Sequence, residues 1–372
     1  MKIDVEKSMP KYLQLKEIIK QHFEKEHYQP DQKIPSENAL IRQFAISRST
    51  VRQTLNELAN EGIIYKKQGA GSFFSGSRKT QTRRSYLIGV IVPRLSFYIY
   101  PQIIRGIHDV VHQQRYNIVL GSSDVQPDKE LACLKQLLEK RIDGILIEPS
   151  GGFLRFENSS NFQVLKALTI PVVFMDWALS DPTISYVAPD DVEGGLRATE
   201  YLIEAGHRRI ACVYPNDTLP GLQRYQGYRK ALETHKIPYE SGLDRAIAIA
   251  QWNEPGNIAL LIRDLLQSGL DKPTAIFFFN DDGALRGYRA IREAGLRVPD
   301  DISIMGFDDS DFAIVPDVPL TTMIHPTYQL GKWAAEILFE HLEHPTQRIP
   351  RQMLLKPTIA VRNSVKRLMI RS

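Results

Sequence analysis

The stretch TAIFFFNDDGALRGYRAIREAGLRVPDDISIMGFD, Thr274 to Asp308, indicates the fold of most of the chain. It begins with a short apolar run, continues with a helical pattern over residues 284–294, and ends with a second apolar run. This order is typical of a strand–helix–strand unit in a parallel sheet. Both runs are apolar without alternation, which indicates strands that are covered on both faces.

The same alternation recurs along the chain from Tyr86 onward. Further apolar runs of strand length are YLIGVIV, YNIVLG, DGILIE, PVVFMD and RRIACVY. Helical patterns occupy residues 101–114, 129–140, 193–205 and 331–342. The region from Tyr86 to Ser372 is too long for one such sheet. We therefore expect an α/β body with two lobes, each built on a doubly wound parallel sheet.

Polar and aromatic side chains gather where several of these predicted strands end. They include Tyr98, Tyr100, Glu148, Asp176, Asn280 and Asp308. Ligands of open α/β sheets bind beyond the carboxyl ends of the strands. Several carboxylates would repel an anionic ligand, whereas acids and amides can hold the hydroxyls of a neutral polyol. The sequence therefore predicts a sugar site at this rim.

Two other interpretations of the acids remain open. A divalent cation could bind them, although the dense D-x-D-x-D spacing of a calcium loop is missing. Single acids could instead cap helices, as we expect of Asp281 or Asp282 and of Asp190 or Asp191. The repetition of acids at one rim favours the sugar site.

A sugar-processing enzyme is the alternative from another functional class. Glu148 and Asp176 could form the acid–base pair of a glycosidase. The chain lacks the G-x-S-x-G and H-E-x-x-H motifs, however, and an enzyme would leave the basic N-terminal region unexplained. We therefore predict a protein that is not an enzyme and that uses no cofactor or metal.

The N-terminus, MKIDVEKSMPKY, lacks the apolar segment of a secretory signal, and no apolar run has the length of a membrane span. The two cysteines, Cys133 and Cys212, suggest thiols in a reducing compartment. We expect a cytoplasmic protein with no membrane partner.

Residues 1–85 hold 16 Lys and Arg against 9 Asp and Glu, whereas the whole chain holds 47 against 43. This basic region predicts a polyanionic partner.

The basic region contains three helical patterns within its first 62 residues. The third pattern begins in ISRSTVRQTL, after Ser47 as its N-cap, and continues to bury Val51, Leu55 and Leu58. This arrangement turns Arg48, Ser49, Arg52 and Gln53 outward, although the dipole disfavours arginines at a helix N-terminus. DNA phosphates and base edges would satisfy them, as in the second helix of a helix-turn-helix. The following segment, IIYKKQGAGSFFSG, predicts two short strands over residues 63–67 and 72–74, joined as a wing.

The segment IPSENALIRQFAISRSTVRQTLNELANEGIIYKKQGAGSFF resembles the winged-helix DNA-binding domain of the GntR family. The resemblance implies that Glu37 and Arg48 read bases, although Glu37 could instead serve only the helix dipole. It also implies that Ser49, Thr50 and Arg52 contact bases or phosphates. The tip of the wing would be Gln68 and Gly69. We expect this domain over residues 1–74, a flexible basic linker over 75–85, and the two-lobed body over 86–372.

The body resembles the effector domain of the LacI/GalR repressors, which share the periplasmic-binding-protein fold. The matching motifs include IGVIVP, KRIDGILIEPS, EYLIEAGHRRIACV, LQRYQGYRKAL and LTTMIHPTYQLGKWAAEIL. The resemblance implies an effector pocket made by Tyr98 or Tyr100, Glu148, Asp176, Arg224, Asn280, Asp308 and His325. His325 could equally be a structural histidine, and Trp252 could cover a sugar or pack in the core.

A GntR-type head on a LacI-type body resembles the arabinose-responsive repressors of bacilli. The resemblance implies a homodimer that binds a palindromic operator in double-stranded DNA and is released by a small sugar, with L-arabinose favoured. Another pentose, a hexose or a nucleoside is the alternative effector.

Overall fold

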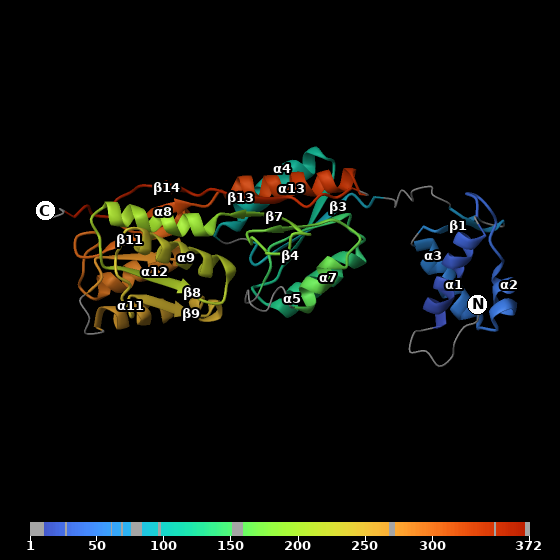
Figure 1. The fold of residues 1–372 in the computed structure, drawn as a ribbon, viewed down its shortest axis with the longest axis horizontal. Helices are drawn as coiled ribbons and strands as arrows, with labels where there is room; N and C mark the ends of the chain where they lie inside the picture. The colour runs from blue at the N-terminus through green and yellow to red at the C-terminus, as the bar shows by residue number, and fades with distance from the viewer. Residues whose placement is uncertain are drawn as a thin grey trace. The chain divides into compact units, whose positions relative to one another are not determined.

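The computed structural model describes residues 11–368, except 27, 61, 68–69, 76–83, 96–97, 151–158, 268–271 and 346. The chain divides into two compact units, Met1–Arg84 and Ser85–Ser372, here called the head and the body (Figure 1). In the described part of the chain, no helix has the length and apolar character needed to cross a membrane.

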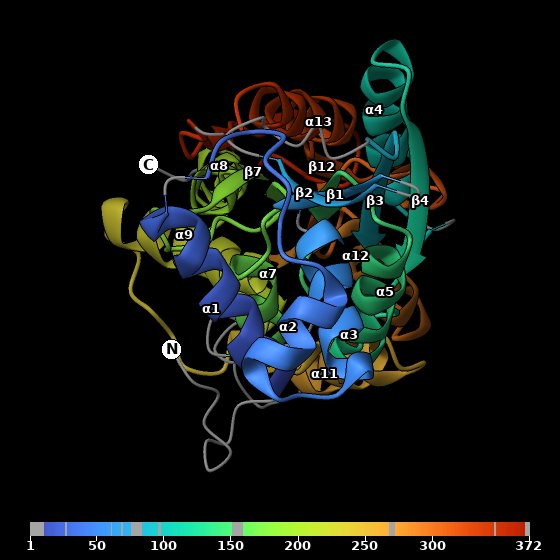
Figure 2. The same cartoon turned by 90° about the vertical axis from the view of Figure 1, so that its right-hand side faces the viewer.

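The head is a winged helix-turn-helix, as the sequence predicts. Its elements are α1 (Lys11–Lys25), α2 (Glu37–Phe44), α3 (Arg48–Asn60), β1 (Ile64–Lys67) and β2 (Gly71–Phe74) (Figure 2). Ser36 caps α2 by accepting a hydrogen bond from the Ala39 N–H, and Ser47 accepts one from the Thr50 N–H. Both serines stand at the predicted N-cap positions.

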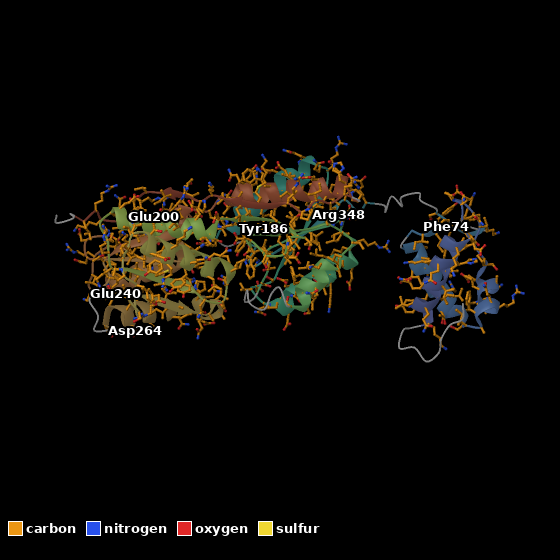
Figure 3. The ribbon with its side chains drawn as sticks, in the orientation of Figure 1. Phe74, Tyr186, Glu200, Glu240, Asp264 and Arg348 are labelled. Carbon is orange, nitrogen blue, oxygen red and sulfur yellow. The ribbon has the colours of Figure 1, made fainter. Side chains whose placement is uncertain are left out.

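The core of the head forms where the helices meet the antiparallel hairpin β1–β2. Val51, Leu55 and Leu58 are buried, as the amphipathic pattern of α3 predicts. Phe74, labelled in Figure 3, packs against Phe23 with ring centroids 4.7 Å apart. This contact ties the end of the wing to α1.

The N-terminal lobe of the body holds a six-stranded parallel sheet of order β13-β7-β6-β5-β3-β4. Its strands are β3 (Leu87–Val92), β4 (Asn117–Ser122), β5 (Gly144–Ile147), β6 (Val172–Met175), β7 (Ser185–Pro189) and β13 (Gln352–Leu355). Its helices are α4 (Tyr100–Gln113), α5 (Pro127–Glu139), α7 (Ser160–Lys166) and α13 (Thr327–Glu343). Helices α4 and α13 lie side by side (Figures 1 and 2).

The C-terminal lobe holds a second six-stranded sheet of order β14-β12-β11-β10-β8-β9. Its strands are β8 (Ile210–Pro215), β9 (Asp244–Ile247), β10 (Ala275–Phe278), β11 (Ser303–Asp308), β12 (Thr321–Ile324) and β14 (Thr358–Ala360). Its helices are α8 (Asp191–Glu204), α9 (Leu219–Thr234), α10 (Ile249–Trp252), α11 (Asn257–Gln267), α12 (Asp281–Glu293) and the short 3₁₀ helix η1 (Asp311–Ile314). Only the edge strand β14 pairs antiparallel among the described strands of this sheet.

The chain passes between the lobes at three short crossovers. They lie between β7 and α8, between β12 and α13, and between β13 and β14. The second crossover contains His325. In both sheets the carboxyl ends of the parallel strands lie on the side of these crossovers. The residues that follow β5, β6, β10 and β11 therefore face one another across the boundary between the lobes.

Candidate functional site

A cavity of about 130 Å³ lies between the two lobes. Its lining includes Tyr98, Tyr100, Glu148 and Asp176 from the N-terminal lobe and Arg224, Asn280 and Asp308 from the C-terminal lobe. The structure therefore brings together seven of the eight predicted effector residues. The eighth, His325, lies behind the cavity wall with its side chain fully buried.

Arg224 is fixed by several contacts at the base of the cavity. Its Nε donates to Asp191 at 2.7 Å and its Nη1 to the Phe279 carbonyl at 2.7 Å, while its guanidinium lies 3.6 Å from the Phe307 ring centroid. The close approach of α8 to α9 places it there, because Gly195 of α8 leaves no room for a side chain beside the Arg224 carbonyl. Arg224 thus presents a guanidinium held in one orientation.

The charge of Arg224 is balanced by two buried acids. Burial raises the pKa of Asp191 to about 6, although Arg224 opposes that rise. Burial also acts to raise the pKa of Asp308, but Arg224 and His325 outweigh it and hold this pKa below its ordinary value. Asp308 is therefore an ionised carboxylate at neutral pH.

His325 forms an ion pair with an acid of each lobe. Its Nε2 lies 2.9 Å from Asp176 Oδ1, and its Nδ1 lies 3.5 Å from Asp308 Oδ1. Burial acts to lower the pKa of His325, but attraction to Asp176 and Asp308 outweighs it and raises the pKa to about 10. The imidazolium therefore links the ends of β6 and β11 through charge.

The two tyrosines of the cavity have different partners. Tyr100 donates a hydrogen bond to Glu148 at 3.1 Å within the N-terminal lobe. Tyr98 reaches the C-terminal lobe, where its hydroxyl donates to Asp308 and accepts from the Asp281 N–H. Burial, followed by repulsion from Asp176, raises the pKa of Glu148. Two aromatic hydroxyls thus contact the acids that line the cavity.

The helix-cap predictions for the acids at the rim are partly wrong. The cap of α12 is Asn280, which accepts from the Gly283 N–H at 2.9 Å, and neither Asp281 nor Asp282 takes that position. Asp282 instead pairs with Arg286. For α8 the prediction is correct, because Asp190 accepts from the Glu193 N–H. Asn280 still lines the cavity while it caps the helix.

Sequence reasoning offered Asp191 and Asp281 only as possible helix caps and missed the contacts that these two buried acids make next to the cavity. Asp191 pairs with Arg224, and Asp281 accepts hydrogen bonds from Ser310 and Thr322. Each is the second residue of the polar group after a strand, in Asp190-Asp191 and in Asn280-Asp281-Asp282. The sequence held one indication of these contacts. Only one residue of such a group can cap the helix, so a neighbouring acid can point into the lobe instead.

Trp252 packs in the core and also lines the cavity. Its side chain belongs to the core of the C-terminal lobe and packs edge-on against Phe279 with ring centroids 5.5 Å apart. It also lines the cavity, and its indole N–H has no hydrogen-bond partner among the described residues. Among these residues, no group of three or more His, Cys, Asp and Glu side chains could hold a metal ion.

The head presents a polar surface on α3. Arg48, Ser49 and Arg52 are exposed, whereas Thr50 is half-buried and its hydroxyl lies 2.8 Å from that of Ser47. Arg48 Nη2 donates to Asn38 of α2 at 3.0 Å, which fixes its direction. Glu37 begins α2 and is half-buried. The predicted wing-tip residues Gln68 and Gly69 lie outside the described residues.

Two segments of the chain match known protein families. Residues 11–74 match the gntR family of bacterial regulatory proteins, and residues 199–365 match a periplasmic binding protein-like domain. The first match covers the described helices and wing of the head, and the second covers most of the C-terminal lobe.

Two similar proteins cover nearly the whole chain, and a solved structure covers about three quarters of it. An arabinose metabolism transcriptional repressor of Geobacillus stearothermophilus is 36% identical over 97% of this chain and 99% of its own length. Another of that name, from Halalkalibacterium halodurans, is 31% identical over 95% of this chain and 96% of its own length. A LacI family transcriptional regulator of Enterococcus faecium, solved with bound ribose, is 27% identical with a TM-score of 0.64, over 76% of this chain and 99% of that one.

Proposed function

This chain belongs to the family of transcriptional repressors that includes the arabinose metabolism repressors of Geobacillus stearothermophilus and Halalkalibacterium halodurans, and we propose that L-arabinose is its effector. It is a regulator of transcription and not an enzyme. Its head is a DNA-binding domain of the GntR type, and its body is of the sugar-binding type. The proposal concerns which sugar binds, where it binds and what the binding does.

The observation that supports a sugar most strongly is the lining of the interlobe cavity. Asp176, Asp308 and Glu148 offer acceptors for hydroxyl groups from two sides, and Arg224 offers a fixed donor. The negative charges of Asp176 and Asp308 disfavour phosphates and carboxylates, and the ring of Trp252 offers an apolar face. A neutral monosaccharide fits this set of groups. The names of the similar repressors, together with the bound ribose of the LacI family regulator, favour a pentose.

The DNA partner in this proposal is a palindromic operator read by two heads of a homodimer in the cytoplasm. The exposed Arg48, Ser49 and Arg52 would enter the major groove, with Glu37 and Thr50 at the edge of the contact. Gln68 and Gly69 would contact DNA from the wing. The bodies would supply the dimer interface, so that the symmetry of the protein matches that of the operator.

Release by sugar requires a difference in affinity between two conformations. The sugar can weaken operator binding only if it binds more tightly to the conformation that binds DNA less well. The cavity lies between lobes joined by short crossovers, so a sugar that contacts both lobes favours their closed arrangement. Closure would then change the spacing of the two heads on the operator.

A thermal-shift series with the full chain tests the effector. L-arabinose, D-xylose, D-ribose, D-galactose, D-glucose and a nucleoside are compared at equal concentration. A ligand that binds only the folded state adds about 2.7 kcal/mol of stability at one hundred times its Kd. We expect L-arabinose to give the largest rise in melting temperature and to release the protein from operator DNA in a gel-shift assay. A rise with another sugar alone would replace the effector, and no rise with any of them would reject the sugar site.

A further inference from the structure

The two lobes share a local arrangement beside the cavity that the sugar site does not account for. In the N-terminal lobe, strand β5 is followed by Glu148-Pro149-Ser150. In the C-terminal lobe, strand β11 ends in Asp308, which is followed by Asp309-Ser310. Each cavity acid is thus followed two residues later by a serine. Each serine is held by a carboxylate that does not line the cavity.

In the N-terminal lobe the holding group is Glu130 of α5, whose side chain is fully buried. Its Oε2 accepts from both the N–H and the hydroxyl of Ser150, each at 2.6 Å. Its Oε1 accepts from Asn161 Nδ2 at 2.9 Å. Both oxygens are therefore engaged, and one of them fixes both the backbone and the side chain of Ser150.

In the C-terminal lobe the holding group is Asp281, which is also fully buried. Its Oδ2 accepts from the N–H of Ser310 at 2.8 Å and from its hydroxyl at 3.2 Å. Its Oδ1 accepts from Thr322 Oγ1 at 2.7 Å. The hydrogen bonds match those of Glu130. The positions of the two carboxyl groups in the fold differ, because Glu130 lies in α5, which follows β4, whereas Asp281 is the first residue of α12, which follows β10.

The two buried carboxyl groups are costly for the fold. Taking such a polar group out of water is unfavourable, and a network of this kind is often no more stable than an apolar one of the same volume. Stability alone therefore does not explain two matched networks. Their shared position behind Glu148 and Asp308 indicates a role in placing these acids.

The sheet and the serine together fix each cavity acid from both sides. Upstream, the Glu148 N–H donates to the Ile91 carbonyl at 3.0 Å, and Asp308 lies in register with Ile324 of β12. Downstream, Ser150 and Ser310 are held by Glu130 and Asp281. Asp308 has a φ of 105°, a conformation that an L-residue keeps only when its surroundings enforce it.

We propose that Glu130 and Asp281 are positioning residues that hold Glu148 and Asp308 in the orientation required for effector binding. We call the two networks the Glu130–Ser150 clasp and the Asp281–Ser310 clasp. Neither carboxylate touches the effector, and each acts through the turn that it fixes. The clasps restrict the conformations of Glu148 and Asp308 before the sugar binds. Sugar binding therefore costs less conformational entropy. This inference rests on the proposed sugar site.

The test uses the full chain and the variants Glu130→Gln and Asp281→Asn. Each change keeps the shape of the side chain but turns one acceptor oxygen into a donor. We expect the Kd for L-arabinose, measured by calorimetry, to rise by about tenfold or more in each variant, with operator affinity in the absence of sugar unchanged. Asp128→Asn, exposed on α5, and Glu293→Gln, exposed on α12, are matched controls and should bind sugar as the wild type does.

A second pair of variants separates positioning from folding. Ser310→Ala removes the hydroxyl that donates to Asp281, whereas Ser310→Thr keeps it at a half-buried position. We expect weaker sugar binding for Ser310→Ala and nearly unchanged binding for Ser310→Thr, at equal melting temperature without sugar. A merely structural role would lower the melting temperature and leave the Kd of the folded protein unchanged. This pair decides the question for Asp281 if Asp281→Asn does not fold, and the same two changes at Ser150, whose hydroxyl donates to Glu130, decide it for Glu130.

The outcomes distinguish the two proposals. If the wild type binds none of the sugars, the proposed effector site itself is wrong. If the wild type binds L-arabinose and the folded clasp variants bind it with the same Kd, the sugar site stands and the positioning role is overturned.

Discussion

The hydroxyl of Tyr98, in the N-terminal lobe, donates a hydrogen bond to the carboxylate of Asp308 in the C-terminal lobe. The same hydroxyl accepts from the Asp281 N–H at 3.2 Å, and the Tyr98 ring stacks on Phe312 with centroids 5.7 Å apart. All three of these partners belong to the opposite lobe. Tyr98 therefore fastens the lobes to each other, whereas Tyr100 contacts Glu148 of its own lobe.

The Tyr98→Phe variant should bind the effector more weakly. It removes the interlobe hydrogen bonds of the Tyr98 hydroxyl, of which the bond to the charged Asp308 is worth about 1.5–3 kcal/mol. Because the proposed binding of the sugar includes closure of the lobes, we expect most of this loss in the Kd for L-arabinose, measured by calorimetry. Tyr100→Phe is the control for losing a hydroxyl at the cavity without losing a contact between lobes, and it should leave the interlobe geometry in small-angle scattering unchanged. Equal scattering profiles for wild type and Tyr98→Phe with sugar bound would contradict the fastening role.

The His325→Gln variant should change how stability depends on pH. The pKa of His325 is about 10 in the folded protein against 6.5 for an unperturbed histidine. The folded state therefore binds more protons between these values, so this contribution to stability is complete below 6.5 and is lost as the pH rises through 10. We expect the free energy of unfolding of the wild type, from urea titrations, to fall over this range more steeply than that of the variant.

The comparison of the two proteins separates the contribution of His325 from that of Asp281. The pKa of Asp281, raised by burial to about 8, gives a fall of the same sign at lower pH in both proteins. Subtracting the free energy of unfolding of His325→Gln from that of the wild type at each pH removes this shared contribution of Asp281. Parallel curves for the two proteins would show that the imidazolium does not carry the predicted charge.

The Arg224→Lys variant should lose its response to sugar and keep its binding to DNA. Lysine retains the positive charge between Asp191 and Asp308 but cannot reproduce the planar fork that also reaches the Phe279 carbonyl. We expect sugar to release operator DNA at least about tenfold less effectively in a gel-shift titration, a difference of about 1.4 kcal/mol. Arg229→Lys, exposed on the same helix, is the control. A normal sugar response in Arg224→Lys would remove Arg224 from the site.

The Arg48→Ala variant should weaken operator binding by about 1–3 kcal/mol if Arg48 reads a base. The guanidinium is exposed at the start of α3 and directed by Asn38. Fluorescence anisotropy with operator and with random DNA, each over a series of salt concentrations, separates a base contact from a phosphate contact. A base contact lowers specificity, whereas a phosphate contact lowers both affinities and the salt slope. Arg263→Ala, exposed on α11 of the body, should change neither.

The strands that the sequence predicts correctly include the central ones, which are covered on both faces. Strands β3, β5, β8, β10 and β11 are runs of buried residues, and their apolar character is visible without any tertiary information. The edge strands β9, β13 and β14 are short and partly exposed, so their sequences carry little signal. Strand β12 is central but begins with two buried threonines, whose hydroxyls have partners far away in the sequence.

The rule that ligands bind beyond the strand ends predicted most of the cavity lining, because a parallel sheet places those ends together. It could not predict the partner of each acid. Asn280, Asp281 and Asp282 are consecutive, yet one caps a helix, one holds Ser310, and one pairs with Arg286. Distant segments decide these roles. Arg224 follows no strand directly, so only the family resemblance indicated it.

The crossover between β13 and β14 makes both sheets of the body complete late in synthesis, after the head. Strand β13 forms the edge of one sheet and β14 the edge of the other, and both lie within residues 352–360. Neither sheet can acquire its last strand until residues 352–360 have left the ribosome, whereas the described helices and strands of the head end at Phe74. Truncation before residue 352 would therefore leave an unpaired strand edge in each lobe, and the nascent chain carries a finished DNA-binding head before it can respond to any ligand.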